Sequence, residues 1–527
     1  MYSKILICLF ALPLFLQAEI PDWVKNQGRS ATYSELRYLT GFGMAKLEKN
    51  GNKAEVRQLA SDYAKKNLIE KIRVSVSSNV VSKNEETEKK YLTYFSSAVQ
   101  STASMDLQGL DTQIYFDDDE NIMYALAIVS RENIAAVYDK RVSDFRSEIE
   151  EHMTNGKRYD EQNQRAKALE EYLACYPLFR QLEEAETILM AAETNQSRSM
   201  SELDGAVQSQ QISMNQVRQA VDKLVQRPIN TTEDLAWYLM YTLKGQVDLQ
   251  GKSVLVAPFT YQDTKMGSPF SRYFKQSLES KAVEVGQWNV VQQTADFQPK
   301  MGNIAKEYAQ ASGASYIFTG TFWELPQGVK VQAILRNVAD SKLVASVEQV
   351  LPGAVIQSSG QSIKPQNFKE AFADQKEFKS GEVVGSGLNI EVWTNKGVDN
   401  LIFTKGERMT VFVRANLPCY IRFIYHLASG ERTLLLNSYY IDDSKVNKVC
   451  QIPPGGEFEC DAPFGSEVLQ VFARTEEFDP VVTVDKDGYK FLQEDLKKFL
   501  VATRGFKAVK QEVMQTEQRV TITTMEQ

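Results

Sequence analysis

The spacing of the hydrophobic residues changes its period several times along this chain, and these changes limit the folds that the chain can adopt. Small and aliphatic residues first recur at every fourth position, as on the face of a helix that lies on a sheet: Val56, Ala60, Ala64, Leu68 and Ile72. Helical spacing then continues from 134 to about 246, helices alternate with buried-strand patterns up to 352, and short strands bounded by turns follow from 388. The sequence therefore predicts an α+β multidomain protein.

The length of 527 residues is enough for three or four domains of about 150 residues each. We expect, in order, a small α+β domain, a helical segment, an α/β domain with a mixed sheet, and a C-terminal β-sandwich-like domain. The predicted limits are 1–18 for a signal peptide, 19–133 for the α+β domain, 134–248 for the helical segment, 249–352 for the α/β domain, 353–387 for a linker, 388–480 for the β-rich domain and 481–527 for a C-terminal helix and strand.

The first residues have the pattern of an export signal. Lys4 precedes the apolar run Ile5–Leu16, which is followed by Gln17, Ala18 and the polar Glu19. The run is too short to cross a hydrocarbon core, which needs about twenty residues, so a retained membrane anchor is the weaker interpretation. We expect cleavage after Ala18 and export to the periplasm or to the periplasmic face of the outer membrane.

Local patterns in the first domain predict its strands and turns. The alternation at Val74–Ser77 predicts one strand, and Met123–Val129 predicts another, after an acidic turn at Asp117–Asn121. Because this turn lacks the ligand spacing of a calcium loop, a solvated hairpin tip is the preferred interpretation and a calcium site the alternative. Gly41–Gly43 predicts a turn or bulge.

The helical segment contains several hydrophobic stripes. Tyr138–Ile149 forms the first, Ala166–Tyr176 the second, which Pro177 is expected to end, and Leu182–Leu189 the third. We interpret this segment as a spacer or an oligomerisation arm, with a simple structural connector as the alternative.

The later segments have clear element signals. Ser253–Phe259 reads as a buried strand, and Ser268 with the following proline begins a helix. Four further strands are expected up to 350, and the linker is expected to hold one short helix. Beyond the β-rich domain, Gly488–Ala502 predicts a helix and Arg519–Thr524 a strand.

Outside the signal segment the chain has four cysteines. Cys450 and Cys460 flank the turn sequence Pro453–Gly456, so they are candidates for a disulfide across a tight loop, and separate buried thiols are the alternative. Cys419 stands in a strand pattern and is expected in the core. The cysteine spacing does not resemble that of a zinc site.

Charge and histidine content exclude several classes of function. The 60 Lys and Arg against 68 Asp and Glu give a net charge of −8, the wrong sign for a nucleic-acid-binding protein. Only His152 and His426 are present, in segments that belong to different predicted domains, so His-based metal sites and triads are not expected. We assign no catalytic, cofactor-binding or metal-binding residue and expect no cofactor.

Three motifs stand in the β-rich domain: LNIEVWTNKG (388–397), GERMTVFVRANLPCYIRFIY (406–425) and APFGSEVLQVFA (462–473). Together they resemble the bacterial domain of unknown function 4384. This resemblance implies a β-sandwich-like accessory module without an established activity.

Two earlier segments also carry family motifs. PDWV (21–24) and YLTGFGMA (38–45), with the alanine-rich helix after them, resemble the N-terminal domain of the flagellar-accessory and surface-lipoprotein group that includes the FlgO and FlgT types. VLVAPF (254–259) and GASYIFTGTF (313–322) resemble the periplasmic domain of CsgG-like and TolB-N-like envelope proteins. These resemblances imply a non-catalytic envelope protein that works by assembly and recognition. The chain departs from CsgG-like pores because it shows no lipidated cysteine near Glu19 and no membrane-inserting strand pair, so pore formation is not expected.

We therefore predict a scaffold or assembly factor, not an enzyme, that binds envelope proteins or itself through exposed strand edges of the α/β and β-rich domains. Peripheral contact with the outer membrane or with peptidoglycan is compatible with this prediction. The alternative is a periplasmic ligand-sensing or glycan- or peptidoglycan-binding protein that uses aromatic residues of the β-rich domain, although such residues are usually core: Trp393, Tyr420, Tyr425, Tyr439 and Tyr440. An enzyme with a carboxylate pair is the third hypothesis, and no acidic residues stand in a recognisable motif for it.

Overall fold

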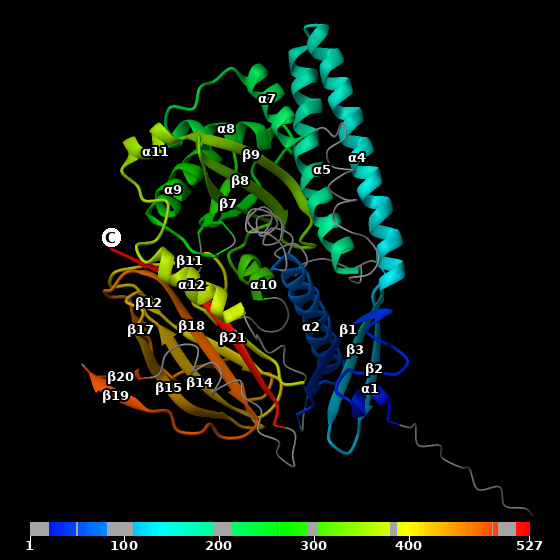
Figure 1. Ribbon diagram of the computed structural model, residues 1–527, viewed down its shortest axis with the longest axis vertical. Coiled ribbons are helices and arrows are strands. Elements are labelled where there is room, and N and C mark those ends of the chain that lie inside the picture. The colour runs from blue at the N-terminus through cyan, green and yellow to red at the C-terminus, as the bar shows by residue number, and fades with distance from the viewer. Residues whose placement is uncertain are drawn as a thin grey trace, which may run out of the picture.

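The computed structural model of the chain describes residues 20–48, 51–81, 109–192, 213–262, 264–292, 304–379, 387–486, 488–493 and 513–526. It confirms the α+β multidomain class. In Figure 1 the N-terminal sheet with its helix (blue) lies beside the C-terminal β-sandwich (yellow to red), the α/β sheet (green) lies above both, and a long helical hairpin (cyan) runs along one side. The expected cleavage point, Ala18, lies outside the described residues.

The N-terminal domain is a three-stranded antiparallel sheet covered by one long helix. Its elements are α1 Asp22–Lys25, β1 Tyr38–Lys46, α2 Lys53–Val81, β2 Asp111–Asp117 and β3 Ile122–Ser130. The strand order is β1-β3-β2, and α2 packs over β1 and β3. Its stripe of four-residue spacing is fully buried against the sheet, as the sequence predicts. β3 and the acidic hairpin tip before it are also confirmed.

Two predictions for this domain are wrong. Val74–Ser77 belongs to α2, because the helix that begins at Lys53 continues through this short alternating run. Gly41 and Gly43 lie inside β1 and form neither a turn nor a bulge. A β-carbon at Gly41 would lie 2.1 Å from the backbone oxygen of Ala64, and one at Gly43 would lie 2.3 Å from that of Ala60. The two glycines therefore allow α2 to approach the backbone of β1.

The long hairpin is formed by α4 Arg131–Glu161 and α5 Arg165–Ala192. Pro177 does not end a helix, contrary to the prediction, because it lies within α5. A proline in a helix interior costs about 3 kcal/mol. Tyr176 before it and Leu182 and Ala185 after it are all buried in the same core, so tertiary packing offsets this cost.

The α/β unit is built on a mixed sheet, as the sequence predicts. Its elements, with the two helices before it, are α7 Met214–Val225, α8 Thr232–Lys244, β4 Ser253–Val256, β5 Thr260–Tyr261, α9 Pro269–Glu284, β6 Asn289–Val291, α10 Ile304–Ala311, β7 Tyr316–Leu325, β8 Gly328–Asn337, β9 Leu343–Pro352, α11 Gly353–Ser359 and α12 Phe368–Lys379. In the order β6-β4-β7-β8-β9, the pairs of β4 with β6 and β7 are parallel and those of β8 with β7 and β9 are antiparallel. Two helices, α11 and α12, stand where the sequence suggested a linker with one. α5 and α8 pack against β9, so the helical segment and this sheet share one hydrophobic core.

The C-terminal domain is a β-sandwich. Its strands are β10 Ile390–Thr394, β11 Leu401–Thr404, β12 Arg408–Met409, β13 Val411–Ala415, β14 Cys419–His426, β15 Arg432–Ile441, β16 Cys450–Gln451, β17 Phe458–Glu459, β18 Gly465–Arg474, β19 Thr483–Lys486, β20 Tyr489–Leu492 and β21 Gln515–Met525. The sheets have the orders β10-β13-β16, β11-β21-β18-β14-β15-β20-β19 and β12-β17. The predicted strand near the C-terminus is confirmed as β21. The predicted helix from Gly488 is wrong at its start, because residues 489–492 form β20, and the rest of it lies outside the described residues except 493.

The close packing of α2 on β1 can be tested with Gly41→Ala. The added methyl group would overlap the backbone of α2, so we expect the free energy of unfolding to fall by about 3 kcal/mol or more in urea denaturation. Gly353→Ala is the control, because its β-carbon would lie 3.8 Å from the nearest atom, and we expect a change below about 0.5 kcal/mol. Equal unfolding midpoints for the two variants would contradict the packing role of Gly41.

Candidate functional site

The two histidines are held in separate structural contacts. His152 Nδ1 on α4 lies 2.7 Å from Glu171 Oε2 on α5. His426 on β14 is buried, and its Nε2 lies 2.9 Å from Gln470 Oε1. Burial lowers the pKa of His426 to about 3, so the ring is neutral at physiological pH. Within the described ranges, no group of three His, Cys, Asp or Glu residues is placed to hold a metal ion.

The disulfide candidates are free thiols in this structure. Cys460 Sγ lies 3.7 Å from the carbonyl oxygen of Phe403, and Cys450 Sγ lies 3.7 Å from that of Lys448. The turn between them does not bring the sulfurs together, because β16 pairs with β13 whereas β17 pairs with β12. Burial raises the pKa of Cys460 to about 11 and that of Cys419 to about 12, which makes both poor nucleophiles.

The five aromatic residues considered for glycan binding are not on one surface. Trp393 and Tyr425 are buried in the core. Tyr420 and Tyr440 stand opposite each other on β14 and β15, with ring centroids 4.7 Å apart, and Tyr440 is 45% exposed. Tyr439 packs partly against the sandwich core. Of this set only Tyr440 is exposed, and Tyr420 beside it is half-buried.

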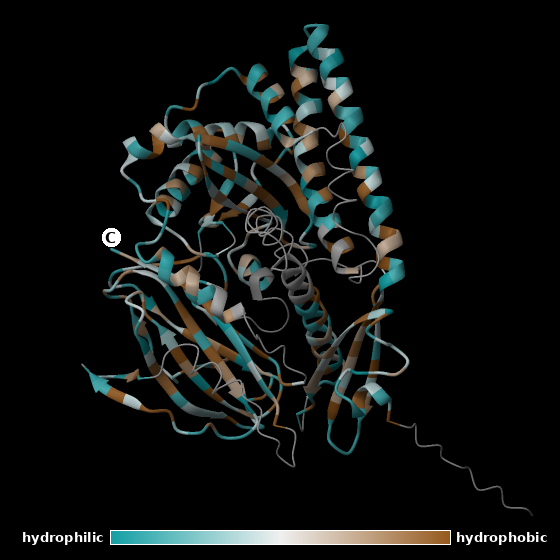
Figure 2. Cartoon of the chain, in the orientation of Figure 1, coloured by the Kyte–Doolittle hydropathy of each residue, from teal (hydrophilic) through white to brown (hydrophobic). Residues whose placement is uncertain are grey.

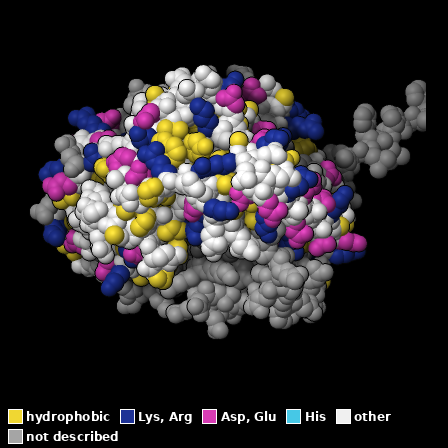
Figure 3. Space-filling model, turned by 90° about the horizontal axis from the view of Figure 1, so that it is seen from above, with side chains coloured by type: hydrophobic (Ala, Val, Ile, Leu, Met, Phe, Trp, Pro, Cys, Tyr) yellow, Lys and Arg dark blue, Asp and Glu magenta, His cyan; other side chains and the backbone are white. Residues whose placement is uncertain are grey.

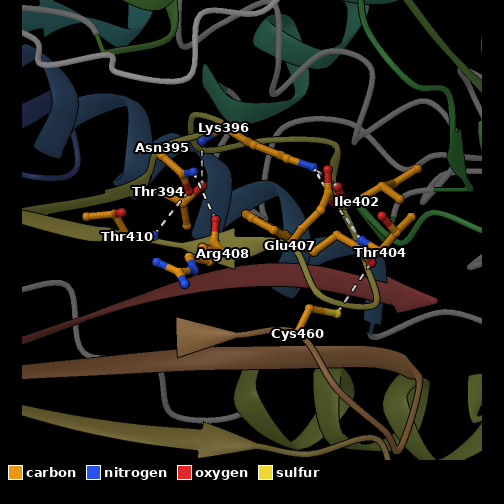
Figure 4. Close-up of polar contacts among 10 residues, drawn as sticks. Thr394, Asn395, Lys396, Ile402, Thr404, Glu407, Arg408, Thr410 and Cys460 are labelled. Carbon is orange, nitrogen blue, oxygen red and sulfur yellow. Dashed lines mark hydrogen bonds and ion pairs between the residues drawn. The ribbon is translucent and has the colours of Figure 1, made fainter. Parts of the chain in front are cut away.

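The sandwich brings together two of the sequence motifs at one end (Figure 4). Lys396 Nζ lies 2.7 Å from Glu407 Oε2 and donates to the carbonyl oxygen of Ile402 at 2.8 Å. The same carboxylate oxygen accepts from the backbone N–H of Thr404 at 2.7 Å. Burial acts to raise the pKa of Glu407, but these hydrogen bonds and the lysine charge outweigh it and lower the pKa. The carboxylate therefore stays ionised and fixes the turn after β11.

Asn395 joins the same two motifs on the neighbouring strand. Its Nδ2 donates to the carbonyl oxygen of Arg408 at 3.0 Å, and its Oδ1 accepts from the backbone N–H of Thr410 at 3.2 Å. Cys460 lies below this turn, with its Sγ 3.7 Å from the carbonyl oxygen of Phe403 (Figure 4). Its backbone N–H donates to the carbonyl oxygen of Glu407 at 2.8 Å. Apart from the ion pair of Lys396 with Glu407, these contacts satisfy backbone groups of the sandwich, which indicates a structural role for the shared motif residues.

The outer edge of β1 is covered in part by side chains of α2. Asn67 on α2 accepts from the backbone N–H of Phe42 at 3.1 Å, and Lys71 Nζ donates to the carbonyl oxygen of Thr40 at 2.9 Å. These bonds satisfy edge groups that would otherwise remain unpaired.

The sandwich bonds to two further carbonyl groups of that edge. Asn416 Nδ2 donates to the carbonyl oxygen of Met44 at 2.7 Å, and Asn447 Nδ2 donates to that of Lys46 at 2.9 Å. We call Asn416 and Asn447, together with the ion pair described next, the interdomain cluster. This cluster attaches the N-terminal sheet to the sandwich.

A buried ion pair completes the cluster. Arg414 Nε on β13 donates to Glu391 Oε2 on β10 at 2.7 Å, and the arginine side chain is fully buried. Lys66 on α2 approaches the other carboxylate oxygen at 3.6 Å, so the pair faces the N-terminal domain. Burial of the adjacent Tyr63 hydroxyl raises its pKa well above the usual value. No local sequence pattern marks this cluster, because its members come from distant segments.

The ion pair can be tested with Arg414→Met. Removing one partner leaves Glu391 buried, so we expect a loss of about 3–5 kcal/mol in urea unfolding. The double variant Glu391→Leu with Arg414→Met should recover most of this loss. As a matched control, Arg408→Met removes the exposed pair with Glu457 and should cost about 1 kcal/mol or less. Equal losses in the single and double variants would contradict a coupled pair.

Glu467 is a second buried carboxyl group of the sandwich. Its Oε2 accepts from the Tyr425 hydroxyl at 2.8 Å, and its Oε1 accepts from the backbone N–H of Ala428 at 3.1 Å. Burial raises the pKa of Glu467 to about 7 despite these hydrogen bonds. The side chain is therefore partly protonated near neutral pH.

This raised pKa predicts a pH dependence of stability. Between the ordinary glutamate pKa and about 7 the folded state binds more protons than the unfolded state, so stability falls as pH rises through this window, by up to about 3 kcal/mol. Glu467→Gln cannot titrate, so its melting temperature relative to the wild type should rise between pH 5 and pH 7.5. His426 titrates in both proteins and cancels in this comparison. A difference that does not change with pH would refute the raised pKa.

Comparisons with known proteins support one part of the sequence analysis directly. Residues 402–477 match the family described as Domain of unknown function (DUF4384), which confirms the resemblance of the C-terminal domain. No curated protein matches the chain. No helix in the described part of the chain is both long and apolar enough to span a membrane.

Several solved structures are similar at low identity. The LpoB C-terminal domain from Salmonella enterica is 16% identical, with 22% of this chain and 95% of that chain covered and a TM-score of 0.19. TolB from Acinetobacter baumannii is 13% identical, with coverages of 42% and 69% and a TM-score of 0.15. The secreted protein HP1454 from Helicobacter pylori is 11% identical, with coverages of 65% and 94% and a TM-score of 0.22.

Proposed function

We propose that this protein is an exported, non-catalytic scaffold or assembly factor of the cell envelope that works through protein–protein contacts. The observation that carries the proposal is the interdomain cluster. It attaches the N-terminal sheet to the sandwich through two asparagine hydrogen bonds and a buried ion pair that Lys66 approaches, so that two units with separate folds present their surfaces in a fixed arrangement. A fixed arrangement of binding surfaces is what a scaffold requires.

The α4–α5 hairpin supports the same proposal. It extends beyond the α/β sheet (Figure 1), and hydrophilic residues predominate along α4 (Figure 2). Arg146 NH2 lies 2.7 Å from Glu186 Oε1 between the two helices, and Lys223 on α7 lies 2.6 Å from Asp160 near the tip. These ion pairs hold the hairpin as a defined arm.

The surface also favours protein contacts over nucleic acid. On the face seen from above, Lys and Arg are interspersed with Asp and Glu, and hydrophobic side chains form separate groups between them (Figure 3). A nucleic-acid-binding face would carry a continuous basic stripe. A periplasmic location follows in this proposal from the export signal expected at the N-terminus.

The proposal can be tested by native mass measurement. We expect the protein, extracted gently from the envelope of its host, to migrate in an assembly larger than the chain purified alone, with defined partner proteins or further copies of itself. A monomeric periplasmic protein of similar mass from the same extract serves as the control. A lone monomer in the soluble fraction would contradict the scaffold role and would favour a ligand- or glycan-binding protein.

A further inference from the structure

The N-terminal sheet has one closed edge and one open edge. At β1 four outward backbone groups are bonded by side chains of α2 and of the sandwich. The outer strand at the other side is β2, whose one partner among the described strands is β3. In the described part of the chain, no side chain of another element hydrogen-bonds to the backbone of β2; the Thr112 N–H is bonded by the adjacent Asp111.

Two other edge strands of the described sheets are covered. The edge of β10 is closed by Gln518, whose Oε1 accepts from the Val392 N–H at 3.0 Å. The edge strand β9 is packed by α5 and α8. An unprotected edge strand is a template for pairing with another chain.

A groove runs beside this open edge, between α2 and β2. It is a hollow of about 480 Å³ lined by residues of α2, β2 and β3: Lys53, Ala54, Arg57, Ile114, Phe116 and Met123. Gly41 and Gly43 allow α2 to lie directly on β1, so β2 makes few contacts with the helix. The groove is the space that remains between α2 and β2. We call this hollow the α2–β2 groove.

The groove has an apolar floor and a cationic wall. Ile114 and Phe116 lie two positions apart on β2 and face the same side, toward α2. Lys53 Nζ lies 3.5 Å from the ring centroid of Phe116 and 3.7 Å from Asp118. Arg57 is exposed and makes no ion pair with another described residue. Both cations stand in the first turns of α2, where the helix dipole adds positive potential.

We propose that the α2–β2 groove binds an extended, acidic segment of a partner protein, which pairs with β2 as an additional strand and directs carboxylates toward Arg57 and Lys53. The proposal rests on the scaffold function proposed above and names the chemistry of one partner. A strand satisfies the open backbone edge, which a lipid headgroup does not, and its alternate side chains reach the wall of the groove. The floor accommodates the methylene groups of glutamate side chains.

The test uses the purified chain and two fluorescein-labelled short peptides, one in which glutamate alternates with valine and one with lysine in place of glutamate. We expect saturable binding of the glutamate peptide by fluorescence anisotropy and at least tenfold weaker binding of the lysine peptide. The double variant Lys53→Glu with Arg57→Glu should lose at least tenfold in affinity for the glutamate peptide. Lys140→Glu, an exposed charge reversal on α4, is the matched control and should bind as the wild type does.

Hydrogen exchange provides the second readout. The bound peptide should slow exchange of β2 amides and leave those of β19 unchanged. Equal binding of both peptides, or an unchanged affinity in the double variant with an unchanged melting temperature, would overturn the proposal. Binding of anionic phospholipid vesicles without binding of the glutamate peptide would also overturn it, in favour of a membrane contact.

These outcomes distinguish a failure of the groove proposal from a failure of the scaffold proposal. If the double variant still enters the native assembly and no peptide binds, the groove proposal fails and the scaffold proposal stands. If the native protein is a lone monomer, the scaffold proposal fails whatever the peptides do.

Discussion

The outward N–H and carbonyl groups of an edge strand need hydrogen-bond partners. In this protein, side chains from two other parts of the chain bond to such groups of β1. Asn67 and Lys71 come from α2, and Asn416 and Asn447 come from the sandwich. An unsatisfied buried carbonyl or N–H costs free energy comparable to a lost hydrogen bond. The geometry of one strand edge therefore fixes the position of the N-terminal sheet on the C-terminal domain.

The buried pair of Glu391 and Arg414 belongs to the same contact but has a different consequence. A buried ion pair is weak evidence for stability, because desolvation offsets much of the attraction. A buried charge is stable only beside an opposite charge or a hydrogen-bond partner, however. Lys66 of α2 lies 3.6 Å from the carboxylate oxygen of Glu391 that does not bond to Arg414. We interpret the pair as a device that selects one orientation of α2 over other apolar packings. α2 thus packs on the N-terminal sheet, contacts the sandwich through Lys66 and lines the α2–β2 groove.

The sequence predicted what depends on regular spacing within one element. The stripe from Val56 to Ile72, the capped helix at Ser268 and the mixed sheet were found because burial repeats with the period of the element. The prediction of a turn or bulge at Gly41–Gly43 is wrong because these glycines serve a contact with another element: they leave room for α2, which lies against β1.

Contacts between distant segments could not be predicted from local sequence patterns. Asn416 and Met44 are 372 positions apart, and no local pattern marks either one as a partner. The motifs around Lys396 and Glu407 were noticed, yet their mutual contact depends on how β10 and β11 are placed in the sandwich. The α2–β2 groove was missed for the same reason, since the strand-edge hypothesis pointed to the α/β and β-rich domains.

The position of β21 has a consequence for the order of folding. This strand lies between β11 and β18, although it follows β18 by some 40 residues and comes after every other strand of the sheet. Because a chain is made from its N-terminus, β11 and β18 are available before β21, with a vacant place between them. The sandwich, and with it the closure of the β1 edge, can be completed only when β21 arrives. Closure of this sheet therefore depends on its last described strand, and a chain that lacked β21 would leave the facing backbone edges of β11 and β18 unpaired.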